Sequence, residues 1–154
     1  MIAVTSSSVA LMDTNILVYA YDLGELSKHT VARELIENLS DDGRLLFSTQ
    51  VLNEFCSVMM RPSRTPPLTP AELVDVIHEL EAISQVVPVT AALTRRALKA
   101  IPRHAMSFWD ALIWAAAVEN AAAIIYTEDF QDGRDVDGVR FVNPFSPGAR
   151  LQGT

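Results

Sequence analysis

The chain has 154 residues and a mass of 16.9 kDa, and 49% of its residues are hydrophobic and 20% charged. This length and composition favour one globular domain that buries about 69% of its unfolded surface, and they exclude a disordered or fibrous chain. Twelve basic and nineteen acidic residues give a net charge of −7, which excludes a protein that coats nucleic acid through general electrostatic attraction.

Neither a membrane span nor a secretory signal is expected. The longest apolar run, Ala111–Val118, is far shorter than the ~20 residues of a membrane helix, and Met1–Met12 has no basic start. The single cysteine, Cys56, excludes an internal disulfide. These features favour a cytoplasmic protein without a membrane partner.

Short apolar runs alternate with helical patterns along the first part of the chain. Val9–Met12 and Leu45–Phe47 are predicted strands. Residues 15–21, 28–39 and 50–60 are predicted helices, with apolar residues at helical spacing in the last two.

The second part begins with a proline-rich connector, residues 61–70, which is too short to separate two domains. Thr69-Pro-Ala-Glu72 then supplies a helix N-cap, a proline at the first helical position and a capping-box glutamate. The remaining predicted elements are helices 71–84, 90–101 and 107–121 and strands 86–89, 123–126 and 139–142, with Pro88 placing strand 86–89 at an edge. This alternation predicts a single α/β domain over residues 1–154, ordered from about 9 to 145, with a mostly parallel sheet flanked by helices.

Four acidic residues fall near the carboxyl ends of strands, where α/β folds bind ligands. Asp13 directly follows the first strand, Asp129 lies three residues after strand 123–126, and Glu54 and Asp110 lie in the first turns of helices. Carboxylates ~4 Å apart repel by about 4 kcal/mol at a protein-like dielectric, so four converging acids need protonation or a divalent cation. An all-oxygen set, without Cys or His at zinc spacing, points to Mg²⁺ or Mn²⁺.

Each acid also has a purely structural interpretation. Asp13 could cap the helix that follows it, and Asp110 could form a capping box with Ser107. Asp129 could brace a turn, and Glu54 could be a solvated helix charge. The occurrence of all four at strand ends favours a site.

The other candidate chemistry is sparse. Residues 61–104 carry six basic and four acidic side chains. The basic ones are candidate phosphate contacts, although a solvated helix face explains them equally well: Arg61, Arg64, Arg95, Arg96, Lys99 and Arg103. The aromatic residues Phe108, Trp109 and Trp114 are expected in the core and not as base-stacking platforms.

Four short motifs resemble, in order, the acidic motifs of PIN domains: Met12-Asp-Thr-Asn15, Leu52-Asn-Glu-Phe55, Ser107-Phe-Trp-Asp-Ala111 and Tyr126-Thr-Glu-Asp129. The VapC toxins of bacterial and archaeal toxin–antitoxin pairs are the most similar subgroup, and the resemblance continues through Thr127–Gly133 and Val139–Pro144. It spans about Val9–Phe145, and no acid of the quartet is missing.

This resemblance implies a PIN-like three-layer fold and Mg²⁺-dependent endonucleolytic cleavage of RNA. Asp13 and Asp110 would be the principal metal ligands, and Glu54 and Asp129 would complete the acidic rim through water or a second ion. Two supporting residues are implied as well: Asn15 would orient the Asp13 loop, and Thr127 would act in the same way near Asp129.

The resemblance also implies protein partners. A homodimer would use helix 71–84 and the exposed Met59 and Met60 at the end of the preceding helix. The alternative is that both helices pack only on their own sheet, because an apolar stripe marks a buried face without identifying its partner. A small antitoxin would lie beside this region and neutralise the toxin.

Two other function classes fit the sequence less well. A haloacid-dehalogenase-type phosphohydrolase requires an acid where Asn15 stands, and a receiver domain requires an acidic pair after the first strand and a late lysine. A non-catalytic PIN-like module that only binds protein or RNA would be favoured by an incomplete acid set. Because the set is complete, a metal-dependent ribonuclease is the favoured hypothesis.

Overall fold

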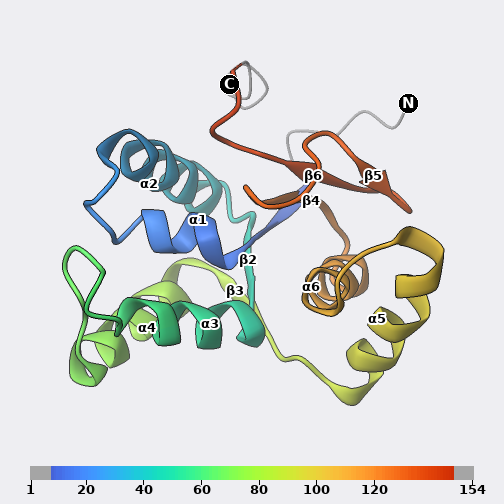
Figure 1. Ribbon diagram of the computed structural model, residues 1–154, viewed down its shortest axis with the longest axis horizontal. Coiled ribbons are helices and arrows are strands. Elements are labelled where there is room, and N and C mark those ends of the chain that lie inside the picture. Colours follow the sequence, from blue (N-terminus) through green and yellow to red (C-terminus); the bar gives the residue numbers. More distant parts are fainter. Residues whose placement is uncertain (1–7, 148–154) are drawn as a thin grey trace.

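The computed structural model describes residues 8–147 (Figure 1). The strands are β1 (Val9–Met12), β2 (Leu45–Ser48), β3 (Gln85–Val87), β4 (Ala122–Tyr126), β5 (Asp135–Val136) and β6 (Val139–Val142). The helices are α1 (Thr14–Tyr19), α2 (Leu26–Asp41), α3 (Thr49–Met59), α4 (Pro70–Ile83), α5 (Ala91–His104) and α6 (Phe108–Glu119). Within the described residues, no helix is both long and apolar enough to cross a membrane.

A single mixed sheet with the strand order β3-β2-β1-β4-β6-β5 lies at the centre of the fold. Neighbouring strands are parallel except for the antiparallel pair of β5 and β6. Helices α1, α2 and α3 lie on one side of the sheet and α5 and α6 on the other (Figure 1). The chain moves across the sheet in one direction from β1 to β3 and then returns to β4. Because crossovers between parallel strands are right-handed, helices that connect strands in opposite directions lie on opposite faces. The predicted fold class, a mostly parallel sheet flanked by helices, is confirmed.

The central strands are covered on both faces. Leu11, Met12 and Phe47 are fully buried, and every residue of β2 is buried. Strands of this kind appear in a sequence as unbroken apolar runs, which is why β1 and β2 can be predicted. Strand β3 lies at the sheet edge, as Pro88 predicts.

Local capping sets where the helices begin. The Thr69 hydroxyl accepts the N–H of Glu72, and the Glu72 carboxylate accepts the N–H of Thr69, so the predicted capping box opens α4. At α6, the Ser107 hydroxyl accepts the N–H of Asp110. Helix α6 is buried nearly all round, from Ala111 to Ala117, as its apolar sequence predicts.

Three local features differ from the sequence predictions. Strand β5 is too short to show periodicity, and it is held by a hydrogen bond from the Trp114 indole to the carbonyl of Val136. Met59 is fully buried, and Met60 alone of the pair is exposed. Trp109 is 59% exposed and therefore lies outside the core, whereas Trp114 is 3% exposed.

Candidate active site

Strand pairing brings the first and last acidic motifs together. Strands β1 and β4 run parallel, with Met12 opposite Tyr126. The N–H of Asp13 donates to the carbonyl of Tyr126 at 2.9 Å, which extends the pairing past the end of β1. Asp13 and Thr127 therefore leave adjacent strands at the same edge of the sheet, and the Thr127 hydroxyl donates to Oδ2 of Asp13 at 2.8 Å.

Asp13 is a buried carboxylate. Its other oxygen, Oδ1, accepts the N–H of Thr14 at 2.7 Å, so Asp13 also caps α1. Burial raises the pKa of Asp13 from 3.8 to about 6, and the hydrogen bonds from Thr127 and Thr14 oppose this shift. The nearby charges of Glu54 and Asp110 add to the increase in the Asp13 pKa. Asp13 is thus both a helix cap and one member of a group of mutually repelling acids.

Glu54 projects from α3 and is held by two hydrogen bonds. The Thr14 hydroxyl donates to its Oε2 at 2.8 Å, and the Gln50 side-chain amide donates to its Oε1 at 3.0 Å. The same Gln50 amide donates to the carbonyl of Trp109 at 3.4 Å, which connects α3 with the start of α6. Glu54 is therefore a fixed, half-buried carboxylate and not a solvated helix charge.

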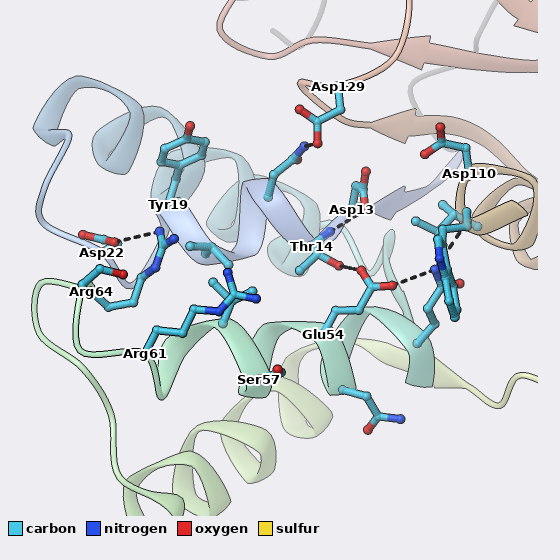
Figure 2. A pocket seen from close by; sticks show the side chains of 18 of the residues that line it. Asp13, Thr14, Tyr19, Asp22, Glu54, Ser57, Arg61, Arg64, Asp110 and Asp129 are labelled. Carbon is cyan, nitrogen blue, oxygen red and sulfur yellow. Dashed lines mark hydrogen bonds and ion pairs between the residues drawn. The ribbon is translucent and has the colours of Figure 1, made fainter. Parts of the chain in front are cut away.

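Asp129 and Asp110 lie on opposite sides of Asp13 in the cleft (Figure 2). Asp129 follows β4, and its Oδ2 accepts a hydrogen bond from the Asn15 amide at 2.8 Å. The N–H of Asp129 donates to the Thr127 hydroxyl at 3.3 Å, so this hydroxyl contacts both Asp13 and Asp129. Asp110 is in the first turn of α6 and supplies the N–H that Ser107 accepts.

The structure brings the four predicted acids into one cleft of about 1290 Å³: Asp13, Glu54, Asp110 and Asp129. Two of the six basic candidates, Arg61 and Arg64, line the same cleft, on the side away from Asp110 (Figure 2). Arg64 forms an ion pair with the buried Asp22 at 3.3 Å. The Arg61 side chain is exposed and has no hydrogen bond or ion pair with another residue of the described part of the chain.

The remaining basic candidates lie elsewhere. They are exposed on α5 and do not line the cleft: Arg95, Arg96, Lys99 and Arg103. The structure therefore separates the six into a cleft pair and an α5 group.

Sequence reasoning missed three residues that organise the site. Gln50 stands four residues before Glu54 on one helix, and this spacing could have revealed it. Thr14 lies inside the first acidic motif, but no local pattern pairs it with an acid 40 residues away. Nothing in the sequence pairs Asp22 with Arg64.

The donor set fits a hard divalent cation. Within residues 8–147, no three Asp, Glu, His or Cys side chains are close enough together to hold one ion directly. Mg²⁺ commonly keeps several waters and takes only one or two carboxylates from the protein. Carboxylates that share one cleft, where the charges of Glu54 and Asp110 help to raise the pKa of Asp13, match this mode of binding, because a cation would relieve the repulsion. Mn²⁺ accepts the same oxygen ligands.

The family model of the PIN domain matches residues 10–137. Since this match covers most of the chain, the protein belongs to the PIN domain family. No protein with a curated description matches the sequence.

Solved structures of toxin–antitoxin proteins share the fold. VapC20 of Mycobacterium tuberculosis, described as a sarcin–ricin loop cleaving toxin, is 22% identical, with a TM-score of 0.61 over 78% of this chain and 89% of its own. A toxin–antitoxin complex from Klebsiella pneumoniae is 17% identical, with a TM-score of 0.64, and the match covers 88% of this chain and 98% of the other. VapBC2 from Rickettsia felis, bound to a DNA fragment from its promoter, is 15% identical, with a TM-score of 0.60, and the match covers 86% of this chain and 96% of the other. At these identities the likeness is one of fold.

The raised pKa of Asp13 predicts how the stability of the metal-free protein depends on pH. As the pH rises above about 4, the unfolded chain loses the Asp13 proton first, whereas the folded protein keeps it until about pH 6. The unfolded state then binds fewer protons, so the free energy of unfolding falls by up to about 3 kcal/mol across this window. Urea denaturation in chelator-treated buffer at several pH values should show this fall in the wild type but not in Asp13→Asn.

Glu37→Gln is the matched control, because Glu37 is exposed on α2. Glu37→Gln should show the same fall in the free energy of unfolding as the wild type, because it retains Asp13. A constant difference between the wild type and Asp13→Asn would contradict the assignment of a raised pKa to Asp13.

Proposed function

We propose that this protein is a metal-dependent endoribonuclease that hydrolyses RNA phosphodiester bonds. One observation carries the proposal: four carboxylates from four separate segments of a PIN-domain chain line a single cleft at the ends of the parallel strands. The likeness to VapC20, described as a toxin that cleaves the sarcin–ricin loop, supports RNA as the substrate class. The proposed place of action is the cytoplasm.

The metal-ligand roles proposed here are those that the PIN-domain motifs imply, and the contacts support the positioning roles. Asp13 and Asp110 are the proposed principal ligands of Mg²⁺, with Mn²⁺ as the alternative, and Glu54 and Asp129 complete the acidic rim. When bound, the cation would polarise a phosphoryl oxygen and lower the pKa of a bound water. The protein itself supplies position, although with other pairs than expected: the Thr127 hydroxyl holds Asp13, and Asn15, expected to orient the Asp13 loop, holds Asp129.

Arg61 is the proposed cleft contact for an RNA phosphate. An acidic protein repels RNA at long range, so binding requires local positive charge close to the site. Arg61 lines the cleft and is free of protein partners in the described chain, whereas Arg64 is engaged with Asp22. Arg64 would contribute charge while remaining paired.

Asp110→Asn tests the nuclease assignment. The amide binds Mg²⁺ poorly, so we expect cleavage of RNA to fall by about 100-fold or more, because even residues that only orient metal ligands cost 10–100-fold. The free energy of unfolding should stay equal or increase, since removal of the Asp110 charge relieves its repulsion of Asp13. Cleavage by the wild type should disappear in EDTA and return with Mg²⁺ or Mn²⁺.

The matched control is Asp75→Asn, an exposed acid on α4 outside the cleft, which should cleave RNA like the wild type. Full activity of a folded Asp110→Asn protein would remove Asp110 from the metal site. Failure of the wild type to cleave any RNA with either cation would refute the proposed function.

Arg61→Ala tests the phosphate contact. We expect KM to rise about three- to tenfold with little change in kcat, and the dependence of log affinity on log salt to become shallower by about 0.7. The control is Arg95→Ala, which removes the same charge from the exposed face of α5. Equal weakening by both substitutions would show that general charge, and not a cleft contact, binds the RNA.

A homodimer and an antitoxin are the proposed protein partners. The similar structure from Klebsiella pneumoniae is a toxin–antitoxin complex, which supports an antitoxin partner. In this chain, an apolar groove of about 380 Å³ lies between α3 and α4, lined by Cys56, Met60, Pro70, Leu73, Val74, Ile77 and His78. Leu73 and Leu80 of the predicted apolar stripe of α4 are buried, and the stripe reaches the surface only where Leu73 and Ile77 line the groove, which is the proposed docking surface.

Val74→Asp tests the homodimer. Val74 is 57% exposed beside the groove, so a charge there should dissociate the dimer without unfolding the monomer. Light scattering should report a dimer for the wild type and a monomer for the variant, and Leu98→Asp on α5 should remain a dimer. A wild type that is strictly monomeric at high micromolar concentration would contradict the homodimer.

A further inference from the structure

One large aromatic side chain lies exposed on the acidic cleft. Trp109 is 59% exposed and is among the residues that line the cleft. It directly precedes Asp110 at the start of α6. The second tryptophan, Trp114, is buried and donates its indole N–H to the carbonyl of Val136. The two indoles of this protein therefore have opposite surroundings.

The indole of Trp109 is supported without being covered. The Phe108 ring contacts it edge-on, with ring centroids 5.1 Å apart and an interplanar angle of 70°. The carbonyl of Trp109 accepts the Gln50 side-chain amide, which ties this residue to α3 and to Glu54. These contacts hold an aromatic surface in place at the acidic rim.

A hydrogen-bond acceptor without a partner lies near Trp109. Gln50 is 8% exposed and lines the cleft, and its side-chain oxygen Oε1 has no hydrogen-bond partner among residues 8–147. A buried amide oxygen without a partner is costly, and a donor from a bound molecule would satisfy it. The N–H groups of a nucleobase are donors of this kind.

The charge of the cleft favours a ligand that binds through its rings. Six carboxylates and two arginines line the cleft, and the chain carries a net charge of −7, so phosphate contacts alone bind RNA weakly. Stacking of a base on an aromatic side chain is independent of charge and tolerates any base. An apolar protein segment would need to bury the acids beside Trp109 as well, which costs free energy.

We propose that Trp109 is a stacking platform for a nucleobase of the RNA substrate, next to the phosphodiester that is cleaved. The position follows from the cleft, because Trp109 and Asp110 both line it from the first turn of α6. The inference rests on the proposed function, since it names the part of the RNA that the same cleft holds. Trp109 is a substrate-binding residue in this proposal, and the acids remain the catalytic group.

The test measures binding apart from cleavage. The probes are a short single-stranded RNA oligonucleotide with a fluorescent label and an abasic oligonucleotide with the same backbone, both in EDTA. We expect Trp109→Ala to bind the RNA about tenfold more weakly and Trp109→Phe to retain most of the affinity. The abasic probe should bind the wild type and Trp109→Ala equally. Leu98→Ala, another exposed apolar residue but on α5, should bind like the wild type.

A second measurement uses the unmodified protein, so it does not depend on the folding of a variant. Acrylamide should quench the fluorescence of the exposed Trp109 and leave the buried Trp114 largely unaffected. Addition of the RNA should protect the quenchable component, and the abasic probe should not. Quenching that the RNA leaves unchanged would overturn the proposal.

The remaining outcomes separate the two hypotheses. If Trp109→Ala binds RNA normally but alters the mass seen by light scattering, Trp109 is a protein contact and the stacking role is wrong. If base-dependent, Trp109-dependent binding is observed but no metal supports cleavage, the stacking role stands and the proposed nuclease function fails. If cleavage occurs with unchanged KM and kcat in Trp109→Ala, the nuclease stands and the stacking role fails.

Discussion

The buried carboxylate of Asp13 is the constraint on which the rest of the site depends. A carboxylate withdrawn from water loses hydration, and here two hydrogen bonds, from the N–H of Thr14 and the hydroxyl of Thr127, partly replace it. Thr127 reaches Asp13 only because β4 pairs in parallel with β1. The sheet topology and the ionisation of one side chain are therefore coupled, and the raised pKa of Asp13 reflects the incomplete compensation.

The loop after β4 is held from both sides. Toward the cleft, Thr127 and Asp129 take part in the hydrogen bonds of the acidic group. On the other side, Glu128 forms an ion pair with Lys28 at 2.8 Å and accepts the Tyr19 hydroxyl at 3.1 Å. The bond to Glu128 raises the pKa of Lys28 above its ordinary value, so this cation stays charged and neutralises Glu128. Of the two neighbouring acids, only Asp129 then adds negative charge to the cleft.

Stability and function oppose each other in this cleft. Acids that repel one another lower the stability of the metal-free protein, and they are retained where a cation and a phosphodiester are proposed to bind. The negative charge of these acids also repels the phosphates of RNA, so the proposed substrate requires other groups at the rim of the cleft to bind it. Arg61 and Trp109, which both line the cleft, are the residues proposed to hold the two parts of a nucleotide, its phosphate and its base. The Gln50 side chain connects the acidic group with the Trp109 end of the cleft.

The sequence by itself determined the strand and helix alternation, the capping box at Thr69 and the order of the four acids, because periodicity and capping are local properties of a chain. Only the tertiary structure decided which partners those acids have, as in the hydrogen bond between Thr14 and Glu54 across 40 residues. It also decided that Met59 is buried and Trp109 exposed. A helical pattern shows that a face is apolar, but whether that face is covered depends on which distant elements pack against it.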